Sequence, residues 1–145
     1  MKPQQYTNHV RYYYPHHFLF YPIVSIAAGL SVYFVFKLPS TEFVWLALAA
    51  QFLLLAWLSF MLRQHYALTN QDRIVRLELR LRYYILTGKQ FEEIEKKLSL
   101  SRVLALRFAS DEEFLSLIDK AMMKNLSADA IKKSVIRWQP DHMRV

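Results

Sequence analysis

Cysteine is absent from the 145 residues of this chain, and glycine occurs only twice. Without a thiol the chain can form no disulfide, no thiolate metal site and no cysteine nucleophile. Gly29 and Gly88 stand too far apart to build the glycine-rich loop that cradles a phosphate group. The sequence therefore excludes several common chemistries before any positive feature is considered.

Charge is missing from two long apolar stretches, residues 18–36 and 43–62. At about 1.5 Å per helical residue, each would span roughly 30 Å, which is the thickness of the hydrocarbon core of a bilayer. A soluble bundle would need more protein to surround two such helices than this chain supplies. A cleaved signal peptide fits the first stretch poorly, because no polar segment follows it. We therefore predict two transmembrane helices that form a hairpin over residues 18–62.

The basic residues predict how this hairpin is oriented. Lys2 and Arg11 precede the first span and five arginines follow the second span within twenty residues, whereas Lys37 is the single basic residue of the linker 37–42. Loops rich in Lys and Arg remain on the cytoplasmic side of a membrane. Both termini are therefore expected in the cytoplasm, and residues 1–17, which are rich in Tyr and His, are expected to form an interfacial tail.

Small and polar residues interrupt the two predicted spans. Ser25 and Gly29 are spaced i, i+4, as are Ala27 and Ser31, and small residues let another helix approach closely. Gln51 lies near the middle of the second span, where an unpaired amide is costly. We expect it to face Ser25, Ser31 or a partner protein rather than lipid. The predicted intramembrane packing residues are Ser25, Gly29, Ser31 and Gln51.

Residues 73–84, RIVRLELRLRYY, alternate between apolar and polar side chains as a β-strand would. A strand needs a second segment to pair with, and the rest of the cytoplasmic half contains no similar one. Leu, Arg and Glu are also strong helix formers. We predict an amphipathic juxtamembrane helix over residues 63–88 that ends at Gly88. It either continues the second span or begins afresh with Thr69 as its cap.

On such a helix the alternation separates into two stripes. The aliphatic stripe is predicted to be an interaction surface, and the basic stripe is predicted to contact anionic lipid headgroups. We also expect i, i+4 ion pairs from Asp72 to Arg76 and from Glu78 to Arg82. The aliphatic stripe consists of Ile74, Leu77, Leu81 and Ile85, and the basic stripe consists of Arg73, Arg76, Arg80 and Arg82.

Residues 89–145 are predicted to form a small all-α cytoplasmic domain. Serines followed by acidic residues, and acids preceding lysines, mark the helix starts. The apolar positions Phe114, Leu117, Ile118, Ala121 and Met122 fall on one helical face. The expected helices cover 91–98, a segment that opens at Ser99 or Ser101, a segment from the capping box of Ser110 and Glu113 to about Asn125, and a segment from Ser127 to Trp138.

Neither the charge nor the histidines of the chain indicate catalysis or DNA binding. The formal net charge is +7, but +4 of it lies in residues 63–90, so the excess is beside the membrane and no DNA partner is expected. His17 and His65 should reach a similar depth in the hairpin, and a bis-histidine haem or metal site is a less favoured alternative. We predict no enzyme, no metal site and no cofactor.

Four segments carry a resemblance to a known family: YTNHVRYYYPHHF at the start, QDRIVRLELRLR after the second span, ALRFASDEEF at 105–114, and AIKKSVIRWQPD with the terminal MRV. Across nearly its whole length the chain resembles the small bacterial two-span membrane proteins called domain of unknown function 6526. The resemblance implies a bacterial membrane protein with a cytoplasmic helical tail, and it supplies no catalytic residue.

Together these patterns predict an all-α membrane protein, in which a transmembrane helical hairpin is followed by a juxtamembrane amphipathic helix and a small helical cytoplasmic domain. We expect a multi-pass protein of the bacterial inner membrane that serves as a non-catalytic accessory or scaffolding subunit of a larger complex. Its expected partners are other inner-membrane proteins and anionic lipids. The alternative is a self-assembling homo-oligomeric module in which the aliphatic stripe pairs between copies.

Overall fold

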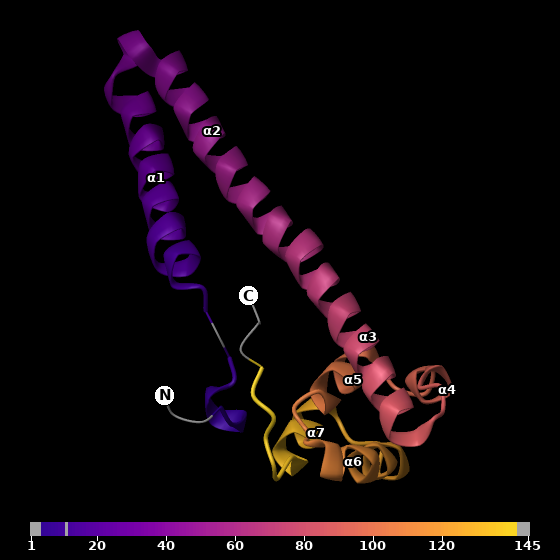
Figure 1. The fold of residues 1–145 in the computed structure, drawn as a ribbon. Helices are drawn as coiled ribbons and strands as arrows, with labels where there is room; N and C mark the ends of the chain where they lie inside the picture. Colours follow the sequence, from indigo (N-terminus) through magenta and orange to yellow (C-terminus); the bar gives the residue numbers. More distant parts are fainter. Residues whose placement is uncertain (1–3, 11, 142–145) are drawn as a thin grey trace. The chain divides into compact units, whose positions relative to one another are not determined.

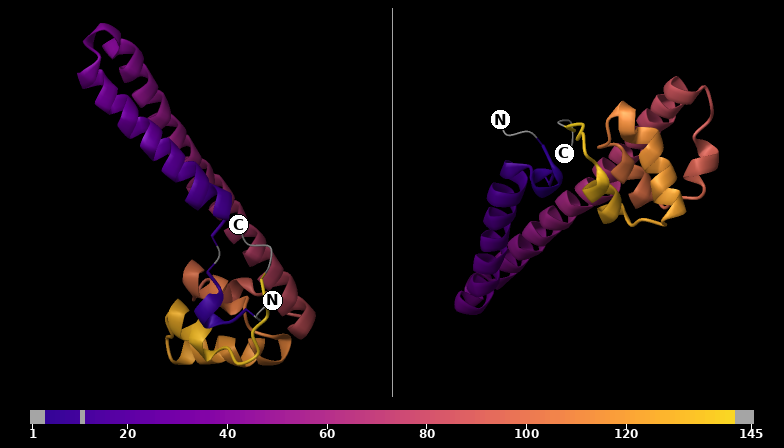
Figure 2. Two further views of the ribbon diagram at one scale, coloured as in Figure 1. Left: turned by 90° about the vertical axis from the view of Figure 1, so that its left-hand side faces the viewer. Right: turned by 90° about the horizontal axis from the view of Figure 1, so that it is seen from below.

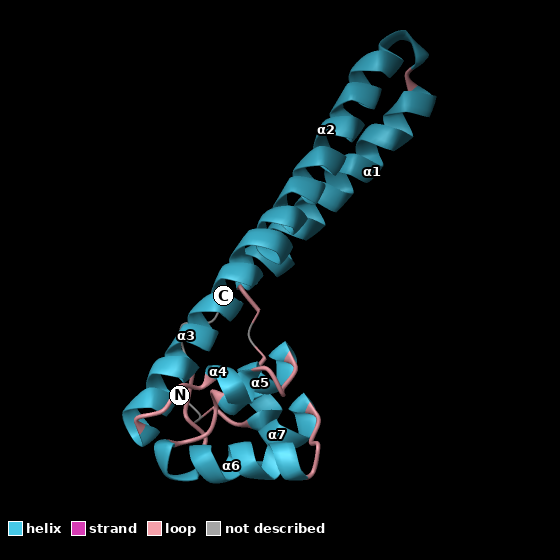
Figure 3. Ribbon diagram, turned by 90° about the vertical axis from the view of Figure 1, so that its right-hand side faces the viewer, coloured by secondary structure: helices cyan, strands magenta, loops and turns pink. Residues whose placement is uncertain are grey.

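The computed structural model describes residues 4–10 and 12–141, and all of its regular elements in these ranges are helical (Figure 3). The prediction of an all-α protein is therefore confirmed. The α-helices are α1 (Tyr21–Lys37), α2 (Glu42–Met61), α3 (Leu68–Thr87), α4 (Glu92–Glu95), α5 (Leu100–Leu106), α6 (Asp111–Met123) and α7 (Ala128–Ser134). Shorter helical turns are η1 (Tyr6–Asn8), η2 (Pro15–Phe20), η3 (Pro39–Thr41) and η4 (Leu62–Ala67).

The described chain divides into two compact units. The first, which we call the hairpin unit, contains residues 12–69. The second, which we call the helical lobe, contains residues 4–10 and 70–141. Residues 4–10, which precede the first apolar helix, thus belong to the same compact unit as residues 70–141, which follow the second apolar helix.

The hairpin unit is built from α1 and α2, which lie side by side and are joined by the short turn η3 (Figure 1). Their contact buries Val24, Ser31 and Ala49, and the rings of Phe34 and Trp45 lie 4.7 Å apart. By length and composition both helical segments are able to cross a membrane, and few of their side chains are buried within the chain. Two apolar helices therefore occur where the two spans were predicted.

The helix that begins after η3 does not end with the second apolar stretch. α2, η4 and α3 follow one another without a non-helical residue, up to Thr87. A new helix capped by Thr69 is therefore wrong, and the continuous alternative is confirmed. Gly88 ends the helix as predicted, because its φ of 68° is a left-handed conformation that glycine adopts without strain.

Residues 73–84 lie within α3, so the alternating segment is a helix and not a strand. Val75 and Leu79 on α3 pack against the other helices of the lobe, which gather beside the end of α3 (Figure 2). Phe91 and Phe114 are almost completely buried there. The core consists of Val75, Leu79, Phe91, Leu98, Val103, Ala105, Leu106, Ala109, Phe114, Leu117, Ile118, Ala121 and Ile131.

Several predicted helix starts are confirmed. Ser110 and Glu113 form the capping box of α6, and the Oγ of Ser127 accepts a hydrogen bond from the N–H of Ala130 at the start of α7. Ser99, rather than Ser101, precedes α5 in an extended conformation. The first short helix is smaller than expected, since α4 covers only Glu92–Glu95 of the predicted range 91–98.

The last helix was predicted to reach Trp138, but α7 ends at Ser134. The chain turns extended at Val135, and the residues beyond it bond to the segment between α5 and α6. Ser110 donates its N–H to the carbonyl of Arg137 at 3.1 Å, and Gln139 donates its N–H to the carbonyl of Phe108 at 2.7 Å. These long-range backbone bonds replace the helical bonds that local propensity favours.

Candidate functional site

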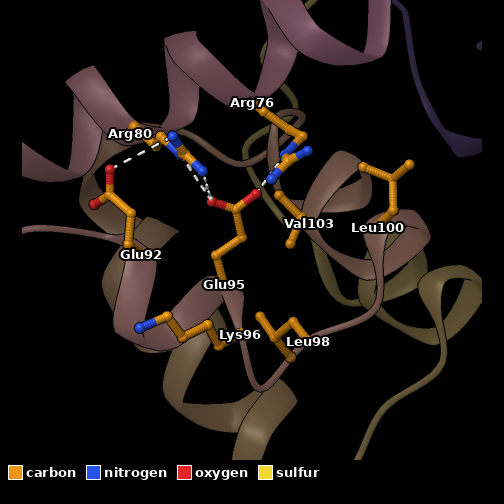
Figure 4. A pocket seen from close by; sticks show the side chains of 8 residues that line it. All are labelled: Arg76, Arg80, Glu92, Glu95, Lys96, Leu98, Leu100 and Val103. Carbon is orange, nitrogen blue, oxygen red and sulfur yellow. Dashed lines mark hydrogen bonds and ion pairs between the residues drawn. The ribbon is translucent and has the colours of Figure 1, made fainter. Parts of the chain in front are cut away.

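Two arginines of α3 and a glutamate of α4 line a cleft in the helical lobe. In Figure 4 the side chains of Arg76 and Arg80 converge on Glu95. Arg80 donates from Nε at 2.8 Å to Oε2 of Glu95, its Nη2 lies 2.6 Å from the same oxygen, and Arg76 donates from Nε to Oε1. The Glu95 side chain is only 10% exposed. One carboxylate therefore binds two neighbouring turns of α3.

These hydrogen bonds set the protonation of the Glu95 carboxyl group. Burial by itself raises the pKa of Glu95, but hydrogen bonds from Arg80 and Arg76 and the charges of both guanidinium groups outweigh it and hold the pKa below its ordinary value. The carboxyl group is therefore ionised at neutral pH. Its charge neutralises part of the predicted basic stripe.

Arg82 makes a comparable set of contacts on the next turn. Its Nε lies 2.5 Å from Oδ1 of Asp111, its Nη2 donates to the carbonyl of Ala109 at 2.6 Å, and its guanidinium carbon lies 4.4 Å from the ring centre of Phe114. Arg82 thus links α3 to the start of α6. Arginine suits this position because its planar group bonds and stacks at the same time.

The predicted i, i+4 pairs from Asp72 to Arg76 and from Glu78 to Arg82 are wrong. Both arginines bond instead to acids outside α3. The physical reason is that the acids on packed elements meet the arginines at partly buried positions, where a charge–charge contact is stronger than a solvated pair along one helix face. Arg73 alone of the basic stripe makes no ion pair within the described ranges. A contact of the stripe with anionic lipid stays a prediction.

The aliphatic stripe lies on the surface of the helical lobe. The exposed fractions of Ile74, Leu77, Leu81 and Ile85 are 56%, 61%, 61% and 71%. Exposure of large apolar side chains in one contiguous row is typical of a contact surface for another molecule.

The four predicted intramembrane packing residues do not share one surface. Ser31 is buried and donates its hydroxyl to the carbonyl of Ala27 at 2.8 Å, whereas Ser25 and Gly29 are exposed. A Cβ added to Gly29 would meet open space. The reason is geometric, because positions 25 and 29 lie on the opposite side of the helix from position 31.

Gln51 is exposed and does not bond to Ser25 or Ser31. Among the residues that the structure covers, its side-chain amide has no hydrogen-bond partner. Gln51 was predicted to face Ser25, Ser31 or a partner protein. Of these three, only the partner protein stays a prediction.

The two histidines considered as a haem or metal site make separate contacts. His17 packs against the ring of Tyr12 at 5.3 Å, and His65 packs against the ring of Tyr66 at 5.4 Å. No group of three or more metal-ligating side chains occurs in residues 4–10 and 12–141. His16 is the histidine that joins the two helices of the hairpin unit, with Nε2 2.8 Å from the hydroxyl of Ser59.

Residues 4–10 form contacts in the helical lobe that no sequence pattern indicated. The side chain of Gln4 accepts from the N–H of Asp141 at 2.7 Å, and the hydroxyl of Tyr6 donates to Asp129. His9 is 9% exposed, and its Nε2 lies 3.2 Å from Nζ of Lys132. We call this segment the N-terminal clasp. It was expected to be part of an interfacial tail.

Aromatic stacking and charge hold the N-terminal clasp in place. The ring of His9 lies 5.7 Å from that of Phe108 and 5.8 Å from that of Trp138. The hydrogen bond to the Asp129 carboxylate raises the pKa of Tyr6, and hydrogen bonds from Lys133 and Tyr6 lower the pKa of Asp129. These contacts join residues that are 99 or more positions apart in the chain, so no local sequence pattern indicated them.

A model of a family described as "Family of unknown function (DUF6526)" matches residues 1–145 of the chain. No curated protein and no solved structure matches it significantly.

Proposed function

The chain belongs to this family of unknown function along its whole length, and we propose that it is a non-catalytic accessory or scaffolding subunit of a larger assembly in the bacterial inner membrane. In this proposal the hairpin unit is the membrane anchor, and the helical lobe is the part that partner proteins meet in the cytoplasm. Each part of the proposal has support in the chain.

The membrane anchor is supported by the surface of α1 and α2. Both helices consist almost entirely of apolar residues, yet only 17% and 6% of their most apolar stretches are buried within the chain. Large side chains such as Phe36, Phe43 and Trp57 are more than 60% exposed. Such a surface is unfavourable in water and favourable in hydrocarbon.

The orientation is supported by the N-terminal clasp. Because residues 4–10 and 70–141 belong to one unit, the two ends of the hairpin lie on the same side of any membrane that it crosses. The basic residues that flank the hairpin outnumber those of its turn, where Lys37 is the single one. By the positive-inside rule this shared side is the cytoplasm.

A single observation carries the proposal of a membrane partner, namely the exposed and unbonded amide of Gln51 halfway along α2. Neither water nor a described residue of this chain supplies a hydrogen-bond partner at that depth of a bilayer. Intramembrane amides bond across helices, and each such bond stabilises association by about 0.6–2 kcal/mol. The exposed small residues Ser25 and Gly29 on α1 also allow a helix to approach closely.

The test is affinity purification of the full chain from native bacterial membranes in mild detergent, followed by mass spectrometry. We expect one or more membrane proteins to co-purify with wild type in a fixed ratio, and Gln51→Leu to reduce their recovery several-fold. Gln64→Leu is the matched control, since Gln64 is an exposed amide in η4 at the end of the second apolar stretch. Recovery of the chain alone, or equal recovery of partners with both variants, would contradict the proposal.

A further inference from the structure

Helix α3 carries apolar side chains on two opposite faces. Val75 and Leu79 are buried in the helical lobe, whereas Ile74, Leu77 and Leu81 point away from it and are more than half exposed. Tyr84, which is 58% exposed, extends the outer row by one more step. Residues 74, 77, 81 and 84 have the alternating spacing of three and four that defines the a and d positions of a coiled coil.

The charges beside the outer row complete this heptad pattern. With Ile74 at a, Arg73 occupies a g position and Glu78 occupies an e position, on opposite flanks of the row. Neither side chain forms an ion pair within the described part of the chain. Arg76, Arg80 and Arg82, in contrast, are all bonded to acids of the lobe. The flanks of the stripe therefore retain one positive and one negative side chain.

We propose that the outer face of α3 is the contact of a parallel, two-fold symmetric dimer of this chain. The five residues from Arg73 to Glu78 are the spacing from g in one heptad to e in the next, and these two positions face each other between parallel helices. Each copy then offers Arg73 to Glu78 of the other, and symmetry produces the pair twice. In an antiparallel dimer g positions face g positions and e positions face e positions. Arg73 would then meet Arg73 and Glu78 would meet Glu78, and like charges repel each other.

The dimer also draws on the membrane hairpin, and in this respect the inference rests on the proposed function. The stripe covers only about two heptads, which is short for a stable coiled coil in water. Confinement to one membrane raises the effective concentration of the second copy and offsets this weakness.

Charge also favours a second copy over a lipid surface as the occupant of the stripe. Helices that lie on anionic membranes carry Lys and Arg along their polar edges. The charged side chains at the g and e positions that border this stripe without an ion pair in the described part of the chain are Arg73 and Glu78, so one base and one acid lie there and the flanks carry no excess of positive charge. A self-complementary flank suits an identical helix better than it suits anionic headgroups.

Cross-linking in vesicles tests the contact, because the natural chain contains no cysteine. The full-length Leu77→Cys variant, purified and reconstituted alone in vesicles, is expected to form a disulfide-linked dimer on mild oxidation. Ser101→Cys is the matched control on α5, since Ser101 is exposed but lies outside the stripe, and it should cross-link much less. A Leu77→Cys chain that stays monomeric would overturn the proposal.

Charge reversal tests the register and the direction of the helices. Arg73→Glu or Glu78→Arg alone should lower the dimerisation constant roughly tenfold, because each replaces two attractive pairs by two repulsive ones. The double variant Arg73→Glu/Glu78→Arg should restore dimers, and Lys96→Glu at the exposed C-terminal cap of α4 should leave the dimerisation constant unchanged. Failure of the double variant to restore dimers would overturn the parallel register, since both side chains are exposed and lie outside the core of the lobe.

The outcomes separate this inference from the proposed function. A wild-type chain that is monomeric in vesicles but still recovers partner proteins from native membranes would refute the dimer and leave the accessory role standing. A chain that dimerises in vesicles but recovers no other protein would refute the accessory role and leave the dimer standing.

Discussion

The hairpin unit and the helical lobe use apolar residues in opposite ways. Among residues 12–69 only Val24, Ser31 and Ala49 are buried, whereas the lobe encloses a continuous core around Phe114 and Ile118. Both units are rich in large apolar side chains. They differ in their polar residues, which alternate with apolar ones at helical spacing in the lobe and are nearly missing from the spans. The lobe can thus fold around its own core, while the hairpin unit depends on an apolar solvent.

The largest expected effect comes from removing the core of the lobe without touching the hairpin. Phe114 is fully buried, packs against Phe91 and carries the guanidinium of Arg82 on its ring. Phe114→Ala should destabilise the lobe by about 3–5 kcal/mol, through lost burial and the cavity it leaves. Hydrogen exchange of the chain in micelles should then show loss of protection in α5 and α6 and unchanged protection in α1 and α2.

Leu115 on the same helix is the control for this comparison, because it is 36% exposed and lies outside the core. Leu115→Ala should leave protection of the lobe almost unchanged. If Phe114→Ala removed protection from the hairpin unit as well, the two units would unfold as one cooperative structure. The hairpin unit would then depend on the core of the lobe.

A smaller effect is expected at the charged contact between α3 and α4. Glu95→Gln removes the carboxylate that holds Arg76 and Arg80, and should lower the free energy of unfolding of the lobe by about 1–2 kcal/mol, since both arginines stay partly solvated. Because the folded-state pKa of Glu95 is lowered, its contribution is present above the ordinary pKa of 4.5 and is lost as pH falls through the folded-state value. Denaturant unfolding at pH 7 and at pH 3 measures both effects.

The variant should therefore differ from wild type more at pH 7 than at pH 3, because the contribution of the carboxylate declines as the pH falls below its ordinary pKa. Glu93→Gln is the matched control, since Glu93 pairs with Lys96 on the exposed surface of the same helix, where its side chain is 76% exposed. If both variants lowered the free energy of unfolding equally, the contacts of Glu95 with Arg76 and Arg80 would stabilise the lobe no more than an exposed ion pair does.

The smallest effect is expected at the N-terminal clasp. Tyr6→Phe removes the hydroxyl that donates to Asp129 and leaves the ring beside Lys133. Faster hydrogen exchange should appear in residues 4–10, with no change in the unfolding midpoint of the lobe. Tyr12→Phe, an exposed ring in the hairpin unit, serves as the control. Unchanged exchange in Tyr6→Phe would show that the aromatic contacts of His9 hold the segment without this hydrogen bond.

The elements that sequence reasoning located correctly depend on neighbouring residues. The capping box at Ser110, the cap at Ser127 and the terminator at Gly88 each act within four residues of the helix end that they define. Helical spacing also identified the buried face of α6, including Phe114 and Ile118. These signals are strong because the hydrogen bonds and the periodicity that produce them are local.

The failures all involve residues far apart in the chain. Sequence placed the partners of Arg76 and Arg82 one turn away on α3, but the structure places them on α4 and α6. It extended the last helix to Trp138, which instead packs on Phe108. It also gave no sign that residues 4–10 bond to Asp129 and Asp141, while the interfacial position of this segment stays a prediction. In each case the structure contains a contact between distant residues that the pattern of neighbouring residues does not indicate.

By itself, the sequence determined that this protein is helical, where its two uncharged helices lie and where most of the other helices begin, because hydrophobic periodicity, propensity and capping are written in neighbouring residues. Only the tertiary structure decided which arginines are neutralised and which face of α3 stays open to another molecule. Sequence shows two interleaved apolar rows on α3, but their roles differ only because the lobe packs against Val75 and Leu79 and leaves Leu77 and Leu81 exposed. A choice between two equally apolar faces requires knowledge of what lies beside them.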